Sequence, residues 1–276
     1  MTAFVVVVGL IVGSFLNVCI VRWPAGESVV RPRSRCPRCA RPVAWHENIP
    51  VLSWLALRAR CRGCAAPISP QYPLVELATA ACWLGAWLAF GPTAAALRVA
   101  LAATLLLGIA VTDLRYYLIP DGFTVTGLLL ALGAAIAGAL SGAGGPFAAG
   151  PFAGPGDALL GACVGAGAIA IIGWLGEVAL GREAMGQGDM TLMAFVGALV
   201  GPLRSFVTIF VAAFLASAIF LVVVAPVVWV RARRRGESFA LPMVPFGVFL
   251  APAALLALLW GERVIAWYLA QLGPVA

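Results

Sequence analysis

The sequence predicts an all-α, polytopic membrane protein: a bundle of about eight transmembrane helices with a small zinc-binding loop domain between the first two. Composition predicts the bundle, because 63% of the 276 residues are hydrophobic and only 11% are charged, whereas soluble domains are roughly half apolar and about one-quarter charged. Two Cys-x-x-Cys pairs within one long polar segment, 22–72, predict the loop domain. The apolar runs are long and unbroken, so helices and not a barrel are expected to span the bilayer.

Each transmembrane helix is predicted from an apolar run of about 20 residues, the length that crosses a bilayer. The sixth run is shorter than the others and meets the seventh at Gly201-Pro202. Residues 138–156 are rich in Gly and Pro and carry no charge, so we expect a loop there between the fourth and fifth spans. The spans are placed near 3–21, 73–90, 95–112, 119–140, 157–180, 190–203, 205–230 and 244–272.

All 18 basic residues are arginines, and their distribution predicts how the chain is oriented. Nine of them lie in the polar segment 22–72. If this segment is cytoplasmic, the alternation of eight spans places 15 arginines on the cytoplasmic side and 3 on the other. Positive residues favour the cytoplasmic side of a membrane, so we expect the N-terminus outside. The net charge of +7 is then a consequence of topology, and no nucleic-acid partner is expected.

Four cysteines in the polar segment predict a metal site. Cys36 and Cys39 form one Cys-x-x-Cys pair, and Cys61 and Cys64 form a second after 21 intervening residues. Two such pairs can supply the four thiolates of a tetrahedral zinc site, which leaves no position for a catalytic water, so the zinc is expected to be structural. Disulfide bonds are the alternative, and a reducing cytoplasm disfavours them. The only histidine, His46, cannot form a histidine-based site by itself.

Two aspartates stand at the ends of predicted spans. Asp113 follows the third span and Asp189 begins the sixth, and alternation places both near the cytoplasmic surface. Ionisable groups at membrane depth are functional candidates. Two carboxyls held in a poorly solvated cleft do not both ionise, so the charged one can take a proton from water while the neutral one hydrogen-bonds a substrate carbonyl. From spacing alone, helix capping explains each aspartate as well as catalysis does.

Three further residues are predicted to support this pair. Gly186 and Gly188 stand directly before Asp189, and without Cβ atoms they would let an extended substrate backbone approach closely. They also permit non-helical backbone where it lines a wet cavity. Asp121 follows Ile119-Pro120 and is predicted to cap the fourth span.

Five blocks, in this order, resemble one protein family. They are "GSFLNVCIVRWP" at 13–24, "CPRC…ENIPVLSWLALRARCRGC…ISPQYPLVEL" within 36–77, "TDLRYYLIPD" at 112–121, "GQGD" at 186–189 and "PFGVFLAPAAL" at 245–255. The chain thus resembles bacterial prepilin peptidases, or type IV leader peptidases, of the GxGD intramembrane aspartic protease group. The resemblance covers nearly the whole chain and assigns Asp113 and Asp189 as the catalytic aspartates.

The resemblance implies a particular activity. Such an enzyme cleaves the basic leader of type IV prepilins or type II secretion pseudopilins at the cytoplasmic face of the bacterial inner membrane. Many members then methylate the new N-terminus with S-adenosylmethionine, an activity associated with the zinc-bearing domain. The implied organisation is a first transmembrane helix (1–22), a cytoplasmic four-Cys zinc module (23–72) and a transmembrane aspartic peptidase domain (73–276).

One departure from the family pattern and several alternatives remain. The family usually has a lysine two residues after the GxGD aspartate, and here Thr191 occupies that position. No glycine-rich S-adenosylmethionine fingerprint is visible, so a peptidase without methyltransferase activity is one alternative. A carboxylate-bearing membrane transporter with a zinc-bearing docking domain is another. A membrane scaffold whose zinc loop binds a partner is a third.

Overall fold

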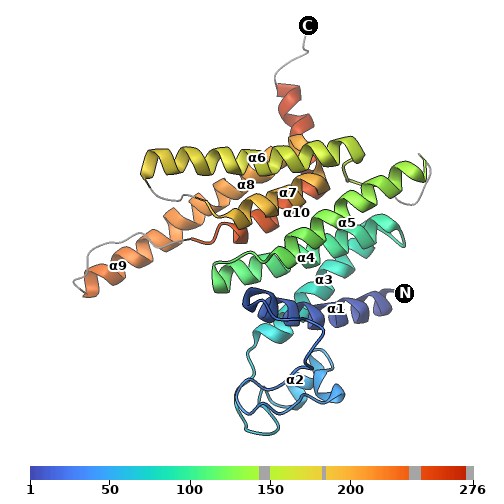
Figure 1. Cartoon of the computed structure of the whole chain (residues 1–276), viewed down its shortest axis with the longest axis vertical. Coiled ribbons are helices and arrows are strands. Elements are labelled where there is room, and N and C mark those ends of the chain that lie inside the picture. The colour runs from blue at the N-terminus through green and yellow to red at the C-terminus, as the bar shows by residue number, and fades with distance from the viewer. Residues whose placement is uncertain (143–149, 182–184, 236–243, 272–276) are drawn as a thin grey trace.

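Long apolar helices form most of the chain in this computed structural model, which describes residues 1–142, 150–181, 185–235 and 244–271 (Figure 1). Within these ranges no β-strand occurs, and seven helices are long and apolar enough to cross a membrane. The predicted all-α membrane bundle is therefore confirmed. The seven are α1 (Thr2–Arg22), α3 (Gln71–Phe90), α4 (Ala94–Tyr116), α5 (Asp121–Leu140), α6 (Pro155–Leu180), α8 (Pro202–Ile219) and α10 (Gly247–Gln271).

The predicted sixth span is a shorter helix, α7 (Gln187–Val200), of 14 residues. At about 1.5 Å per residue it is about 21 Å long, less than the roughly 30 Å of a hydrocarbon core. From Leu192 onward it is buried almost completely, with Leu192, Met193 and Val196 fully enclosed. It packs on α5, α6, α8 and α10. Protein therefore surrounds α7, so the helix does not need the length of a lipid-facing span.

Helix boundaries differ from the prediction at three places that matter for the site. The third span was expected to end at 112, but α4 continues to Tyr116, so Asp113 lies inside its last turn. The predicted loop 138–156 lies partly outside the described residues; its described parts end α5 at Leu140 and begin α6 at Pro155. The seventh span continues through a π-helical turn (Phe220–Val224) into α9 (Ala225–Arg235).

Glycines allow the closest helix contacts in the bundle. Gly9 and Gly13 of α1 lie against α3, where added Cβ atoms would stand 2.7 Å from the Cα atoms of Ala80 and Glu76. In the contact between α6 and α7, the backbone of Gly161 meets that of Gly197. Small residues at such positions let helix backbones approach closely where lipid offers no hydrophobic driving force. The α1–α3 and α6–α7 pairs are accordingly the most extensive helix contacts.

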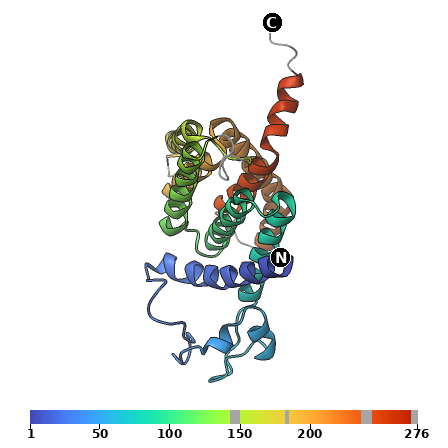
Figure 2. The ribbon, with the colours of Figure 1, turned by 90° about the vertical axis from the view of Figure 1, so that its right-hand side faces the viewer.

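The segment between α1 and α3 forms a separate feature on the side of the bundle (Figures 1 and 2). This four-Cys module has little regular structure. Its elements are the 3-10 turns η1 (Trp23–Ala25) and η2 (Trp45–Asn48) and the five-residue helix α2 (Leu52–Ala56). The buried carboxylate of Glu76 in α3 accepts a hydrogen bond of 2.7 Å from the Val51 N–H and so ties the module to the bundle.

Candidate active site and metal centre

Asp113 lies in the last turn of α4, where its side chain is buried with 5% exposure. One carboxylate oxygen, Oδ2, accepts a hydrogen bond of 3.2 Å from the backbone N–H of Val248 in the first turn of α10. A Cβ at Gly247 would stand 2.8 Å from the same oxygen. The partial positive charge at the start of α10 therefore faces Asp113 and favours its charged form. Asp113 therefore does act at a helix terminus, but that terminus is the start of α10 and not an end of its own helix, α4.

Asp189 is the third residue of α7 and is half-buried. The N-cap position belongs to Gly186, and no side chain makes a capping hydrogen bond there. The first turn is closed instead by the Asp189 N–H, which donates to the Gly186 carbonyl over 3.2 Å. The Asp189 carboxylate also interacts with the backbone N–H of Gly186, so it lies at the helix terminus and borders the cavity at the same time.

One cavity of about 680 Å³ brings the two aspartates together. Asp113 and Asp189 both line it, with the turn between α4 and α5 (117–120), the first two residues of α5, residues 186–188 and Thr191. Asp121 also lines it, and none of the described lining residues is basic. Carboxylates from two separate helices thus border one cavity. Two such groups repel each other when both are charged.

The two glycines before Asp189 differ in what surrounds them. A Cβ at Gly186 would meet no atom closer than Oδ2 of Asp189 at 3.8 Å, so this position is open toward the cavity, as expected. A Cβ at Gly188 would stand 2.9 Å from the Cβ of Ile119. The close approach at Gly188 is therefore made by the α4–α5 turn of the chain itself, a reason that the sequence did not reveal.

Asp121 does not cap α5 as predicted. Pro120 occupies the N-cap position, and Asp121 is the first helical residue, exposed and without a capping hydrogen bond. Its carboxylate still suits the first turn, where negative charge complements the helix dipole. Thr191, which stands where the family usually has lysine, lines the cavity and donates its hydroxyl to the Gly188 carbonyl over 3.0 Å.

The four predicted metal ligands come together in the four-Cys module. The sulfur atoms of Cys36, Cys39, Cys61 and Cys64 all lie within 4.8 Å of one another. A tetrahedral zinc with Zn–S bonds of about 2.3 Å requires sulfurs about 3.8 Å apart, and Cys36 and Cys64 are 3.8 Å apart. The four residues therefore fit a structural zinc ion. They leave no ligand position open for water.

The two Cys-x-x-Cys pairs have the same local geometry. In each, the N–H of the first cysteine donates to a carbonyl five residues later, Arg41 for Cys36 and Ala66 for Cys61. The residue after each second cysteine has a left-handed backbone, with φ of 56° at Ala40 and 54° at Ala65. Each pair therefore forms a tight loop that directs both sulfurs to one side.

Backbone N–H groups tune the thiols for metal binding. Those of Cys39 and Arg38 lower the pKa of Cys36 to about 6, and those of Cys64 and Gly63 lower the pKa of Cys61. At Cys64 the N–H of Ala66 acts in the same direction, but burial and neighbouring thiols raise its pKa to about 11. Charge on one sulfur thus disfavours charge on the next, as expected for thiols spaced to share one cation.

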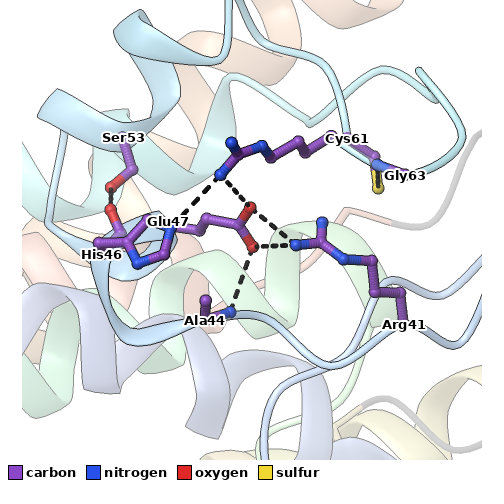
Figure 3. Close-up of polar contacts among 8 residues, drawn as sticks. Arg41, Ala44, His46, Glu47, Ser53, Cys61 and Gly63 are labelled. Carbon is purple, nitrogen blue, oxygen red and sulfur yellow. Dashed lines mark hydrogen bonds and ion pairs between the residues drawn. The ribbon is translucent and has the colours of Figure 1, made fainter.

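Glu47 joins the two Cys-x-x-Cys loops (Figure 3). Its carboxylate accepts hydrogen bonds of 3.0 and 3.2 Å from Arg41 and one of 3.2 Å from the Ala44 N–H. Arg62, in the second loop, lies 3.7 Å away. The hydrogen bonds from Arg41 and from Ala44 lower the pKa of Glu47. Sequence reasoning did not single out this carboxylate, because its partners are recognisable only after folding.

Comparisons with known proteins agree with this arrangement. The family model for the Bacterial Peptidase A24 N-terminal domain matches residues 7–90, and that for the Type IV leader peptidase family matches residues 100–222. The Prepilin leader peptidase/N-methyltransferase of Aeromonas hydrophila is 35% identical over 94% of this chain and 91% of its own length. The chain belongs to the type IV leader peptidase family.

Other members of the family give the same result. The proteins of that same name from Stutzerimonas stutzeri and Myxococcus xanthus are 36% and 45% identical over 95% and 71% of this chain. These alignments span 92% and 55% of the relatives' own lengths. No solved structure matches the chain. The predicted family, and with it leader-peptide cleavage and N-methylation as the family's named functions, is confirmed.

Two features of the leader peptidase cavity were missed from the sequence. Trp23, from the start of the four-Cys module, lines the cavity. Gly247 and the Val248 N–H hold Asp113. In the block at 245–255 a glycine begins an apolar run, which is visible in the sequence. Its contact with Asp113 could not be predicted, because Asp113 lies 135 residues away from Val248 in the sequence.

Proposed function

We propose that this leader peptidase cleaves the basic leader of prepilins and pseudopilins with Asp113 and Asp189 as its catalytic pair. The observation that carries the proposal is the single cavity lined by both carboxylates, one from the last turn of α4 and one from the first turn of α7. A transporter or a scaffold gives no reason for two carboxylates to share one cavity. Neither alternative agrees with the peptidase family to which the chain belongs.

The arrangement supports hydrolysis by a water molecule held between the carboxyls. Asp113 carries the charge, because the start of α10 stabilises its anion, and it takes a proton from the water. Asp189 is protonated and donates a hydrogen bond to the scissile carbonyl. The water oxygen adds to the carbonyl carbon, the C–N bond breaks, and the leaving nitrogen receives a proton from the pair. No covalent enzyme intermediate forms.

Charge complementarity supports a basic leader as the substrate. The described lining includes Asp113, Asp121 and Asp189 and no basic side chain. Such a surface attracts a cationic peptide and raises its local concentration. The arginine distribution supports a bacterial inner-membrane enzyme with its N-terminus outside and its four-Cys module and cavity at the cytoplasmic face.

The described residues fit a zinc ion but not a glycine-rich site for S-adenosylmethionine. Zinc would be held by Cys36, Cys39, Cys61 and Cys64 and would fix the fold of the module. For S-adenosylmethionine, the methyl donor that the relatives' name implies, no glycine-rich turn between a strand and a helix exists within the described ranges, which hold no strand. The residues do not fit that kind of site, and we derive no methylation step from them.

Conservative substitution of each aspartate tests the catalytic pair. In purified, membrane-inserted protein, Asp113→Asn and Asp189→Asn should each lower the rate of prepilin cleavage by at least about 10²–10⁴-fold, the usual contribution of general acid–base catalysis. Asp157→Asn is the matched control, because Asp157 is also in the first turn of a helix, α6, but does not line the cavity. Retained cleavage in either of the first two variants would refute the assignment.

A further inference from the structure

Trp23 lines the cavity that holds the two aspartates. It comes from a different part of the chain than the other residues that line this cavity. The other described lining residues come from the last turn of α4, the α4–α5 turn, the start of α5 and residues 186–191. Trp23 follows α1 and begins the η1 turn that leads into the four-Cys module. A residue of the N-terminal part of the chain is therefore placed beside the two carboxylates.

The indole of Trp23 is held firmly by the start of α5. Its ring packs edge-on against Phe123, with centroids 4.4 Å apart and planes at 84°, and Phe123 is completely buried. On the same turn, a Cβ at Gly122 would stand 2.5 Å from Cδ2 of the indole. Phe123 and Gly122 thus fix the ring position, while the indole itself remains half-buried and borders the cavity.

The backbone beside Trp23 is also fixed. The preceding residue, Arg22, donates to the carbonyl oxygens of Ser28 and Pro32 over 2.8 and 2.7 Å. These bonds fold residues 22–32 back on the end of α1. An aromatic ring whose position and backbone are both fixed contributes contact area at low conformational cost.

We propose that Trp23 is a specificity-determining residue, whose indole contacts an apolar side chain flanking the scissile bond of the substrate. Leu118 and Ile119 also line the cavity and supply further apolar surface. The acidic groups of the cavity receive the basic leader, and this apolar wall receives the residue on the other side of the cleaved bond. The inference rests on the proposed catalytic role of Asp113 and Asp189.

Cleavage kinetics with paired substrates test this role. The probes are prepilins that differ only in the residue after the cleaved bond, either phenylalanine or serine, with kcat and KM measured separately. In the unmodified enzyme the phenylalanine substrate should be preferred. Trp23→Ala should reduce that preference about 10-fold, within the range that pocket contacts to apolar groups supply, chiefly by raising KM. Trp23→Phe should restore most of it.

The controls separate specificity from structural damage. Trp45→Ala removes an indole that is 79% exposed and does not line the cavity, so the preference should not change. A merely structural role for Trp23 predicts equal loss on both substrates, and that result, or an unchanged preference in Trp23→Ala and Trp23→Phe, overturns the inference. Failure of the catalytic assignment would appear differently, as cleavage that survives Asp113→Asn.

Discussion

The four-Cys module and the aspartate cavity each bring together short segments that are distant in the sequence, but different forces hold them. In the module, about 50 residues contain only two 3-10 turns and one five-residue helix. Its two loops meet through four sulfurs and the carboxylate of Glu47. The cavity instead lies between the ends of long helices, positioned by buried packing and close glycine contacts.

This difference implies that the two sites fail in different ways. A metal-held loop structure loses its fold when its ligands are removed, because there is little other buried apolar surface to stabilise it. A cavity between packed helices keeps its fold but loses its geometry when an atom is added at a close contact. Mutations in the first region should therefore affect metal content and local stability, and those in the second should affect catalytic rate.

The largest effect is expected from removing metal ligands. The double substitution Cys36→Ser and Cys61→Ser leaves two thiolates, so bound zinc measured by atomic emission should fall from about one per chain to near zero. Proteolysis should then cut within residues 23–70, because the loops are no longer joined. Cys163→Ser is the control, since this exposed cysteine of α6 is far from the cluster in the sequence and outside it. Unchanged zinc content in the double variant would contradict the metal assignment.

In the cavity, the sharpest test is Gly247→Ala. The added Cβ would stand 2.8 Å from Oδ2 of Asp113, so the carboxylate must move. Displacement of a catalytic group by about 1 Å can cost about 10²-fold in rate, and we expect kcat to fall by that order while zinc content stays constant. Gly133→Ala in α5 is the control, because a Cβ there meets no atom within 4 Å. Equal kcat values for both variants would exclude α10 as a support for Asp113.

A smaller effect should separate the two glycines of the GxGD motif. Gly188→Ala pushes against Ile119, whose Cβ would be 2.9 Å away, and overpacking of this kind costs about 1–3 kcal/mol. Gly186→Ala meets no atom within 3.8 Å. Thermal unfolding of the two variants should therefore show a lower midpoint for Gly188→Ala. If Gly186→Ala has the lower midpoint, the packing role of Gly188 is wrong.

The smallest effect is expected for Glu47→Gln in the module. Since hydrogen bonds to Arg41 and Ala44 lower the pKa of Glu47, its stabilising contribution is present above the unfolded-state pKa. It is lost as the pH falls through the folded-state pKa, which lies below the ordinary value of 4.5. Zinc release on heating should therefore occur at lower temperature in the variant at pH 7, and the two proteins should converge under more acidic conditions. A constant difference at all pH values would contradict this reasoning.

Sequence predicted the parts of this molecule that depend on local pattern. The spans follow from apolar length, and the metal ligands follow from the spacing of Cys36, Cys39, Cys61 and Cys64, because each loop is complete within seven residues. Alternation of spans also predicted Asp113 and Asp189 on one side of the membrane, and the two residues line one cavity. These features needed no knowledge of which helix packs on which.

The missed features all depend on contacts between distant segments. Gly188 seemed to serve a substrate, but its near neighbour is Ile119, which belongs to the α4–α5 turn. Asp121 seemed a good cap, but Pro120 takes the N-cap position. Gly247 of α10 lies against the Asp113 carboxylate of α4. Trp23, near the N-terminus, lines the same cavity as Asp113. A pattern within one segment carries no information about such partners.

The length of α7 determines the depth of the Asp189 carboxylate in the membrane. This helix joins α8 directly at Gly201, so in the proposed orientation both helices meet at the external surface. A helix of about 21 Å that starts there stops about 9 Å short of the far edge of a 30 Å hydrocarbon layer. In that orientation the Asp189 carboxylate would lie beneath the lipid headgroups. The scissile bond of a substrate would have to reach that same depth to meet the proposed catalytic pair.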